Sequence, residues 1–129
     1  MPFINVKVAG PQLDKSQTVA LQKGVTAAMA EVLRKKGPLT AVLVEQVPAA
    51  GWSIGGEPVT RAAQLDAYVS AGTNTPEEKA RFVAEVFALL RKVLGPELPE
   101  ISYVLVHDLP MNSWGYGGLT QEYRAQQRS

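Results

Sequence analysis

The chain has 129 residues, of which 46% are hydrophobic and 19% charged, and its formal net charge is +1. This size and composition predict one compact domain, or two tightly fused half-domains, with enough apolar area for a core. The small net charge gives no reason to expect nucleic acid or a membrane as partner, and the absence of cysteine excludes disulfides, thiolate metal sites and a cysteine nucleophile. Neither a signal-peptide pattern nor a long apolar run occurs, so we expect a soluble cytoplasmic protein.

The first predicted elements are a strand from Pro2 to Ala9 and a helix. Apolar side chains alternate with others along the strand, which is typical of a strand with one buried face. Asp14 and Gln17 form a capping-box pattern that predicts the start of the helix. The basic residue, glycine and proline of Lys36-Gly37-Pro38 predict its end. The apolar face of this helix is expected to comprise Leu21, Val25, Ala28, Met29 and Val32.

A second strand and a short hairpin follow. The segment "AVLV" from residue 41 is almost continuously apolar, as expected of a central strand packed on both faces. The hairpin after it contains Trp52 and the pair Gly55-Gly56. We interpret these glycines as turn residues that need a positive φ angle.

The rest of the chain repeats this order of elements. A shift of 62 residues aligns Trp52 with Trp114, the two Gly-Gly pairs, and the strand "AVLV" with "YVLV". These matches fall at strand and turn positions, where geometry is restrictive. The sequence therefore predicts a single domain made of two fused repeats, residues 2–60 and 64–122.

The second helix is predicted from Thr75 onward. Thr75 is a suitable N-cap, Pro76 occupies the first helical position, and Glu78 follows three residues after the cap. The tail "TQEYRAQQRS" is interpreted as a solvated end. The apolar face of the second helix is expected to comprise Phe82, Val83, Val86, Phe87, Leu90 and Leu94.

These elements predict an α/β (α+β) fold. Two strands joined by a helix pair in parallel through a right-handed crossover, so two such βαβ units give a four-stranded sheet backed by two helices. The helices cover one face of the sheet, and the other face still carries apolar residues. A small domain of this kind usually forms oligomers around such a face.

Pro2 is the first candidate for chemistry. Removal of Met1 by methionine aminopeptidase is expected, because proline is small, and it would leave a free secondary amine. An α-amino group titrates near pH ~7.7–8.0, and burial lowers that pKa because it favours the neutral form. Such an amine can act as a general base or as a nucleophile. The alternative is that Pro2 is only the tolerated first residue of a strand.

The segments "MPFINVKVAG", "GPLTAVLVEQV" and "GWSIGGEPV", with the weaker "SYVLVHDLPMNSWGYGG", resemble the tautomerase superfamily. Over essentially its whole length the chain is similar to a fused, tandem-repeat 4-oxalocrotonate tautomerase. The resemblance implies a tautomerase/MIF-like fold, a homotrimer, no cofactor and no metal. It implies keto-enol tautomerisation of a small carboxylate such as a 2-hydroxydienoate or phenylenolpyruvate, with the N-terminal proline as general acid/base.

The two repeats differ in whether they can have a free N-terminal proline. The second repeat begins inside the chain, at Gln64, and cannot have a free N-terminal proline. We therefore expect one working site per chain, built around Pro2. The resemblance places Trp114 beside Pro2 as a pocket wall, and Trp52 near the vestigial site. Both tryptophans are alternatively core anchors.

The chain also departs from the family pattern. The arginine expected after the first strand is replaced by Pro11, with Thr73 in the second repeat, and the second strands carry no arginine either. This puts a dicarboxylate substrate in doubt. We expect Lys36 or Arg34 to hold the substrate carboxylate instead, and Tyr103 to contact the substrate. The alternatives are that residues 34–36 only complement a helix dipole and that Tyr103 is a core or interface residue.

Two other functions are compatible with these residues. One is a proline-dependent hydratase, dehalogenase or decarboxylase of a small unsaturated acid, for which an acidic residue beside Pro2 would be the mark. No carboxylate occupies the second hairpin, which argues against hydrolytic dehalogenation. The other is a non-catalytic oligomeric binding protein. The single histidine, His107, is interpreted as structural, because no second ligand supports a metal site.

Overall fold

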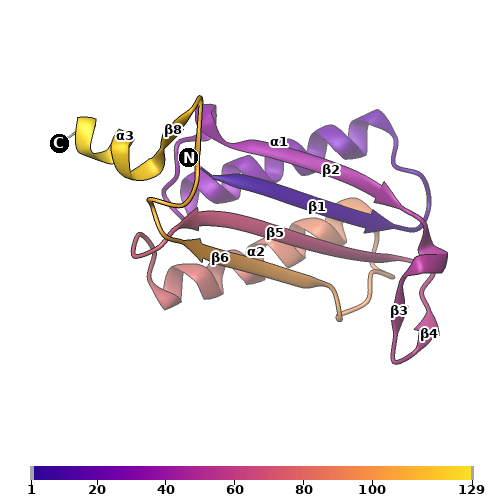
Figure 1. Ribbon diagram of the computed structural model, residues 1–129. Helices are drawn as coiled ribbons and strands as arrows, with labels where there is room; N and C mark the ends of the chain where they lie inside the picture. The colour runs from indigo at the N-terminus through magenta and orange to yellow at the C-terminus, as the bar shows by residue number, and fades with distance from the viewer. Residues whose placement is uncertain (1, 129) are drawn as a thin grey trace.

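The computed structural model describes residues 2–128 (Figure 1), so the expected removal of Met1 lies outside the described residues. Within that range no helix is long and apolar enough to cross a membrane. The strands are β1 (Phe3–Ala9), β2 (Ala41–Val47), β3 (Ser53–Ile54), β4 (Glu57–Pro58), β5 (Ala62–Ser70), β6 (Tyr103–Leu109), β7 (Gly115–Tyr116) and β8 (Leu119–Thr120). The helices are α1 (Lys15–Glu31), α2 (Pro76–Leu94) and α3 (Gln121–Arg128), with two short 3₁₀ turns, η1 (Gly37–Leu39) and η2 (Ala49–Gly51).

The main sheet has four strands in the order β2-β1-β5-β6. β1 pairs in parallel with β2, and β5 pairs in parallel with β6. The two units meet through the antiparallel pair β1 and β5, in which Phe3 lies opposite Tyr68. The predicted four-stranded α/β sheet of two fused βαβ repeats is therefore confirmed.

This topology gives the sheet two distinct ends. The start of β1 lies at the same end as the finish of β5 and β6, because β5 runs antiparallel to β1. The hairpin β7–β8 and helix α3 follow β6 at this end, and the hairpin β3–β4 lies at the other (Figure 1). We call these the Pro2 end and the far end.

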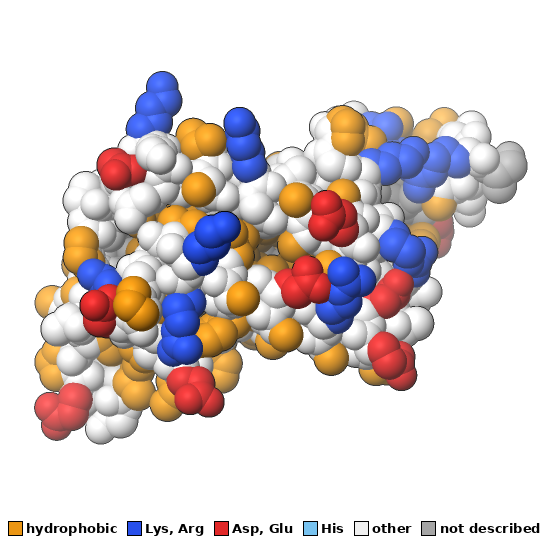
Figure 2. Space-filling model, turned by 180° about the vertical axis from the view of Figure 1, so that it is seen from behind, with side chains coloured by type: hydrophobic (Ala, Val, Ile, Leu, Met, Phe, Trp, Pro, Cys, Tyr) orange, Lys and Arg blue, Asp and Glu red, His pale blue; other side chains and the backbone are white. Residues whose placement is uncertain are grey.

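Helices α1 and α2 pack side by side on one face of the sheet, and their outer surface carries interspersed acidic and basic side chains (Figure 2). Both predicted capping boxes are present: the Gln17 N–H donates to Asp14 Oδ1 at 2.7 Å and the Glu78 N–H to Thr75 Oγ1 at 3.1 Å. The core lies between the helices and the sheet. Its fully buried large side chains include Ile4, Val6, Leu21, Val25, Met29, Leu33, Leu65, Phe82 and Leu90.

Helix α1 ends at Glu31, five residues before the predicted end at Lys36. Arg34 adopts a left-handed backbone conformation, φ 59°, which no helix can continue through. The side chain of Asn74, from the other repeat, donates to the free Leu33 carbonyl at 2.9 Å. The helix therefore ends before the sequence signal is reached, where the Lys35 N–H donates back to the Met29 carbonyl at 3.0 Å and Asn74 binds the Leu33 carbonyl.

The face of the sheet opposite the helices is more polar than predicted. Phe3, Leu43 and Tyr103 are exposed there, but a row of hydrogen-bonded polar side chains lies between them. Asn5 donates to Glu45 at 2.6 Å, and the buried carboxylate of Asp66 is 2.7 Å from His107 Nε2. The His107 ring also stacks on Tyr68, with centroids 4.5 Å apart.

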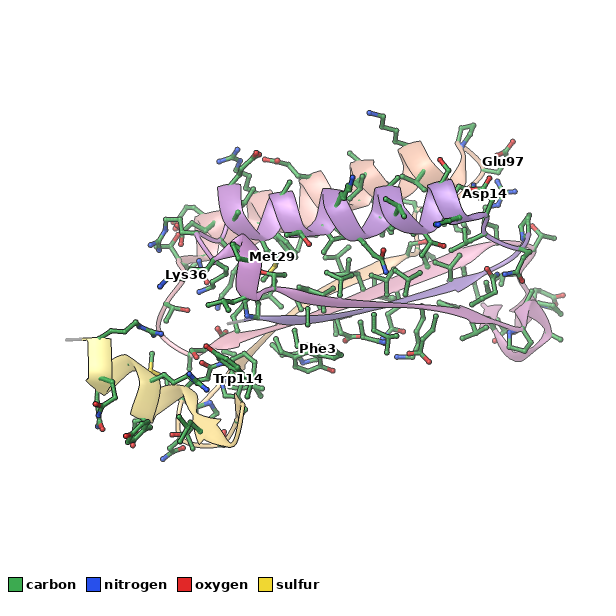
Figure 3. The ribbon with its side chains drawn as sticks, turned by 90° about the horizontal axis from the view of Figure 1, so that it is seen from above. Phe3, Asp14, Met29, Lys36, Glu97 and Trp114 are labelled. Atoms are coloured by element: carbon green, nitrogen blue, oxygen red, sulfur yellow. The ribbon has the colours of Figure 1, made fainter. Side chains whose placement is uncertain are left out.

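The tail interpreted as a solvated end is a helix, α3, and it packs against the second hairpin. The Tyr123 N–H donates to Thr120 Oγ1 at 3.0 Å, so Thr120 is an N-cap. The Gln121 N–H donates to the Trp114 carbonyl at 2.9 Å. Viewed from above, α3 lies at the Pro2 end on the side of the sheet away from α1 and α2 (Figure 3).

Candidate active site

A cavity of about 190 Å³ surrounds Pro2 at its end of the sheet. This volume is below the ~300–1,000 Å³ of pockets for drug-sized ligands, so it suits a small molecule. Pro2 is buried, and its carbonyl accepts a hydrogen bond from the Ala41 N–H at 3.2 Å. Residues of both repeats line the cavity: Pro2, Arg34, Lys35, Lys36, Val69, Ser70, Thr73, Met111, Gln121, Ala125 and Arg128.

One wall of the cavity is the basic run from Arg34 to Lys36, between α1 and η1. Arg34 Nε donates to Glu78 at 2.7 Å, and its Nη2 donates to the Thr73 carbonyl at 3.0 Å. Hydrogen bonds from Arg34, from the Thr75 N–H and from Asn74 hold the pKa of Glu78 at about 2. The charge of Arg34 is therefore compensated within the chain.

Lys35 turns toward the second repeat. Its Nζ donates to Thr73 Oγ1 at 2.8 Å, and the side chain is half-buried. Burial, and after it the positive charge of Arg34, lowers the pKa of Lys35 from its ordinary value. Sequence reasoning named this lysine only as part of the run. Lys36 is exposed at the rim of the cavity and makes no side-chain ion pair with the described residues.

Helix α3 forms another wall. Gln121, Ala125 and Arg128 all line the cavity, and their spacing of four and three residues places them on one helix face. Sequence reasoning missed this element. Thr120 followed by a run of good helix formers was the available signal.

Trp114 lies at the Pro2 end of the sheet but does not line the Pro2 cavity. It lines a neighbouring hollow of about 320 Å³ formed by residues 112–115 and 118–120. Its indole Nε1 is buried without a hydrogen-bond partner among the described residues. Both Trp114 and Phe3 lie on the side of the sheet opposite α1 and α2 (Figure 3).

Tyr103 lies at the far end. It begins β6, pairs with Gln64 at the start of β5, and is 67% exposed. There it lines an open hollow of about 600 Å³ with Ile54 and residues 99–102. Within one chain, the structure brings together Pro2, Arg34 and Lys36, and it does not bring Tyr103 to them.

The two end loops differ in charge, although Arg34 is paired with Glu78 and Glu97 with Arg61. The loop between α1 and β2 at the Pro2 end carries Arg34, Lys35 and Lys36, whereas the loop between α2 and β6 at the far end carries Glu97 and Glu100. Lys36 and Glu97 lie at opposite ends of the sheet (Figure 3). An anionic ligand is therefore favoured at the end that holds Pro2.

Comparisons with known proteins identify the family and the fold. The family model described as tautomerase enzyme matches residues 2–62 and again 66–123. Probable tautomerase K2 of Dickeya dadantii (strain 3937) is 34% identical over 64 residues, which are 50% of this chain and 96% of that protein.

Two solved structures have the same fold. A native fused 4-OT superposes with a TM-score of 0.83 at 22% identity and covers 95% of this chain and 98% of that one. A fused 4-OT described as a wild-type symmetric trimer superposes with a TM-score of 0.82 at 20% identity, covering 93% and 96%. The resemblance to a fused 4-oxalocrotonate tautomerase is thus confirmed for family and fold.

Proposed function

The chain belongs to the tautomerase family, and from that premise we propose that it is a cofactor-free keto-enol tautomerase of small 2-hydroxydienoate or phenylenolpyruvate-like acids. Pro2, freed by removal of Met1, is the general acid/base. The observation that carries this proposal is the cavity around Pro2. It is lined by four basic residues and, among the described residues, by no carboxylate.

These surroundings suit a neutral amine. Burial disfavours the charged form of Pro2, and the nearby cations disfavour it again. Both effects lower the pKa of the Pro2 amine, so that it can accept a proton at neutral pH. The same cations attract the substrate carboxylate, which aligns the enol with the amine.

The reaction moves one proton. The Pro2 nitrogen accepts the proton of the enol hydroxyl, and the electron pair of that O–H bond forms the ketone as the C=C electrons move to carbon. The protonated amine then delivers its proton to that carbon. Lys35 and Lys36 hold the carboxylate during the transfer, and the charge of Arg34 is already balanced by Glu78.

We extend the proposal to a cytoplasmic homotrimer, because a fused 4-OT of the same fold is described as a trimer. β2 and β6 are the unpaired edges of the main sheet, and edge strands readily pair with neighbouring chains. In a trimer, Tyr103 and Trp114 could contribute to the site of a neighbouring chain, which would give the exposed Tyr103 ring a partner.

The first experiment is an intact-mass measurement of the purified protein, with a phenylenolpyruvate ketonisation assay and a native mass on the same sample. Loss of Met1 together with turnover is expected. Pro2→Ala, which keeps methionine removal, should lower kcat/KM by about 100-fold or more, because a general base contributes roughly 10²–10⁴. Undiminished turnover in this variant would contradict the mechanism.

The same experiment separates the alternatives. A hydratase or dehalogenase needs an acid to activate water, and no lining residue of the cavity supplies one. A free Pro2 with no turnover on any enol acid would instead indicate a binding protein. Retained Met1 would leave an amide nitrogen at Pro2 and rule out catalysis through that atom.

A further inference from the structure

Helix α3 is an element that the first repeat lacks. After the first hairpin the chain enters β5 at Ala62, four residues beyond the end of β4, whereas after the second hairpin it forms the eight-residue α3. The two hairpins themselves are closely matched, since their glycine pairs have φ angles of 62° and 83° at Gly55-Gly56 and of 62° and 82° at Gly117-Gly118. The added helix stands at the end of the sheet that holds Pro2.

The helix is fixed to the second hairpin and to the loop before it by its first turn and by Arg124. Arg124 Nη2 donates to the Tyr116 carbonyl at 3.0 Å, and its guanidinium lies 3.9 Å from the centroid of the Tyr116 ring. The Glu122 N–H donates to the Met111 carbonyl at 2.9 Å. Arg124 lies beside Gln121, Ala125 and Arg128 on the same side of α3, and the latter three line the cavity.

Arg128 brings an uncompensated charge to this cavity. It forms no ion pair with the described residues, in contrast to Arg34, which pairs with Glu78. Small Ala125 precedes it on the same face and leaves the cavity open. A guanidinium binds a carboxylate through two parallel hydrogen bonds, which an ammonium group cannot do.

We propose that Arg128 is a specificity-determining residue that binds the substrate carboxylate together with Lys35 and Lys36, which line the same cavity. The inference rests on the proposed function in taking the Pro2 cavity as the substrate site. Helix α3 is then the element that selects acids over neutral enols of the same size. It adds no group to the proton transfer itself.

The test compares Arg128→Gln with Arg81→Gln. Arg81 lies on the exposed side of α2, where it pairs with Glu85, so the control removes the same charge away from the cavity. Each variant is assayed with phenylenolpyruvate and with its methyl ester, which is matched in shape but uncharged. Binding of 3-phenylpropionate, which cannot tautomerise, is measured by calorimetry on the same samples.

In Arg128→Gln the KM for the acid and the Kd for 3-phenylpropionate should rise about tenfold or more, as expected for loss of a hydrogen bond to a charged group. The ester should change less than twofold, and Arg81→Gln should match the wild type. Arg128→Lys should fall between the two, since it keeps the charge without the paired hydrogen bonds.

Equal losses on acid and ester would assign Arg128 a structural role and overturn the inference. Unchanged affinity for the acid, or a wild type that does not bind 3-phenylpropionate, would overturn it as well. A wild type that binds this acid through Arg128 but ketonises neither enol would contradict only the proposed function. Failure of the inference and failure of the proposed function are thereby distinguishable.

Discussion

Lys35 lines the Pro2 cavity, and its contacts there bear on the proposed proton transfer. It is half-buried, bonded to Thr73, and has a lowered pKa because burial and the Arg34 charge both disfavour its ammonium form. A cation placed beside the Pro2 amine disfavours protonation of that amine. In the proposed mechanism the lysine therefore acts on the base as well as on the substrate.

Replacing Lys35 with Met keeps the aliphatic stem and removes the charge. We expect KM for phenylenolpyruvate to rise about tenfold and the acid limb of kcat/KM to move to higher pH by roughly half a unit to one unit. The sign follows because loss of a neighbouring cation raises the pKa of the amine, so the neutral base forms at higher pH. Rate profiles between about pH 5 and 9, a range that brackets the ordinary α-amino pKa, measure both effects.

Lys36→Met is the matched comparison, because Lys36 lines the same cavity from an exposed position at its rim. It should raise KM without moving the pH profile. A shift of the profile in Lys36→Met and none in Lys35→Met would reverse the assignment of the two lysines.

Glu78 holds Arg34 in place, and its own titration gives a test of stability. Its pKa is about 2 in the folded chain against an ordinary 4.5, chiefly because Arg34, the Thr75 N–H and Asn74 donate to the carboxylate. The unfolded chain therefore binds more protons between these values, so this contribution is full above the ordinary pKa and is lost as pH falls toward 2.

Glu78→Gln should lower Tm at neutral pH and flatten the fall in Tm between pH ~5 and ~2, because a glutamine does not titrate. Thermal unfolding followed by circular dichroism across this range is the measurement. Glu77→Gln, in the same first turn of α2, is the control and should keep the wild-type slope. Parallel curves for wild type and Glu78→Gln would show that the ion pair contributes nothing in acid.

Among the elements, the second hairpin matters most for the proposed role of α3, because α3 packs against it. An added Cβ at Gly115 would lie 1.9 Å from the Leu119 carbonyl oxygen and 2.7 Å from Thr120 Cα, both backbone atoms. The corresponding residue of the first hairpin is Ser53, so the second hairpin is closed more tightly than the first.

Gly115→Ala should therefore open the β7–β8 hairpin and displace α3. We expect kcat/KM for the acid substrate to fall at least tenfold, because Arg128 loses its position, while the global free energy of unfolding changes by roughly 1 kcal/mol or less. Steady-state kinetics and chemical unfolding on one preparation measure the two effects. Gly51→Ala, where an added Cβ meets nothing within 4 Å, should be neutral in both. Wild-type kinetics in Gly115→Ala would show that the hairpin does not position α3.

For individual elements, the sequence predicted the features that local signals determine, such as the starts of helices. The caps at Asp14 and Thr75 start the two long helices where the pattern placed them. The end of α1 was predicted too late, because the left-handed turn at Arg34 has no glycine to signal it and the Asn74 contact with the Leu33 carbonyl joins segments 41 residues apart. Helix α3 was missed because the polar tail was interpreted as a solvated end, whereas Gln121, Ala125 and Arg128 line a cavity that residues of the first repeat also line.

For the whole molecule, the 62-residue repeat predicted the sheet and its parallel pairs, and the resemblance of the proline start and the Gly-Gly hairpin predicted the family. It could not show how the two repeats face each other. The antiparallel pairing of β1 with β5 is what separates Tyr103 from Pro2 and brings Arg128 to it. Roles for Pro2, Lys36, Arg34, Trp114 and Tyr103 remain predictions that kinetics must test.

The opposite charges of the two end loops also bear on how a substrate arrives. Basic side chains are visible at the upper right in Figure 2, and Arg128 of α3 lines the same cavity as the basic 34–36 loop, while Glu97, paired with Arg61, and Glu100 lie at the far end. The formal net charge of +1 conceals this separation. The basic side chains attract a small diffusing anion toward the Pro2 end before it contacts the protein. Since the screening length is only about 8 Å at physiological ionic strength, that guidance acts over the last few molecular diameters of the approach and weakens as salt is added.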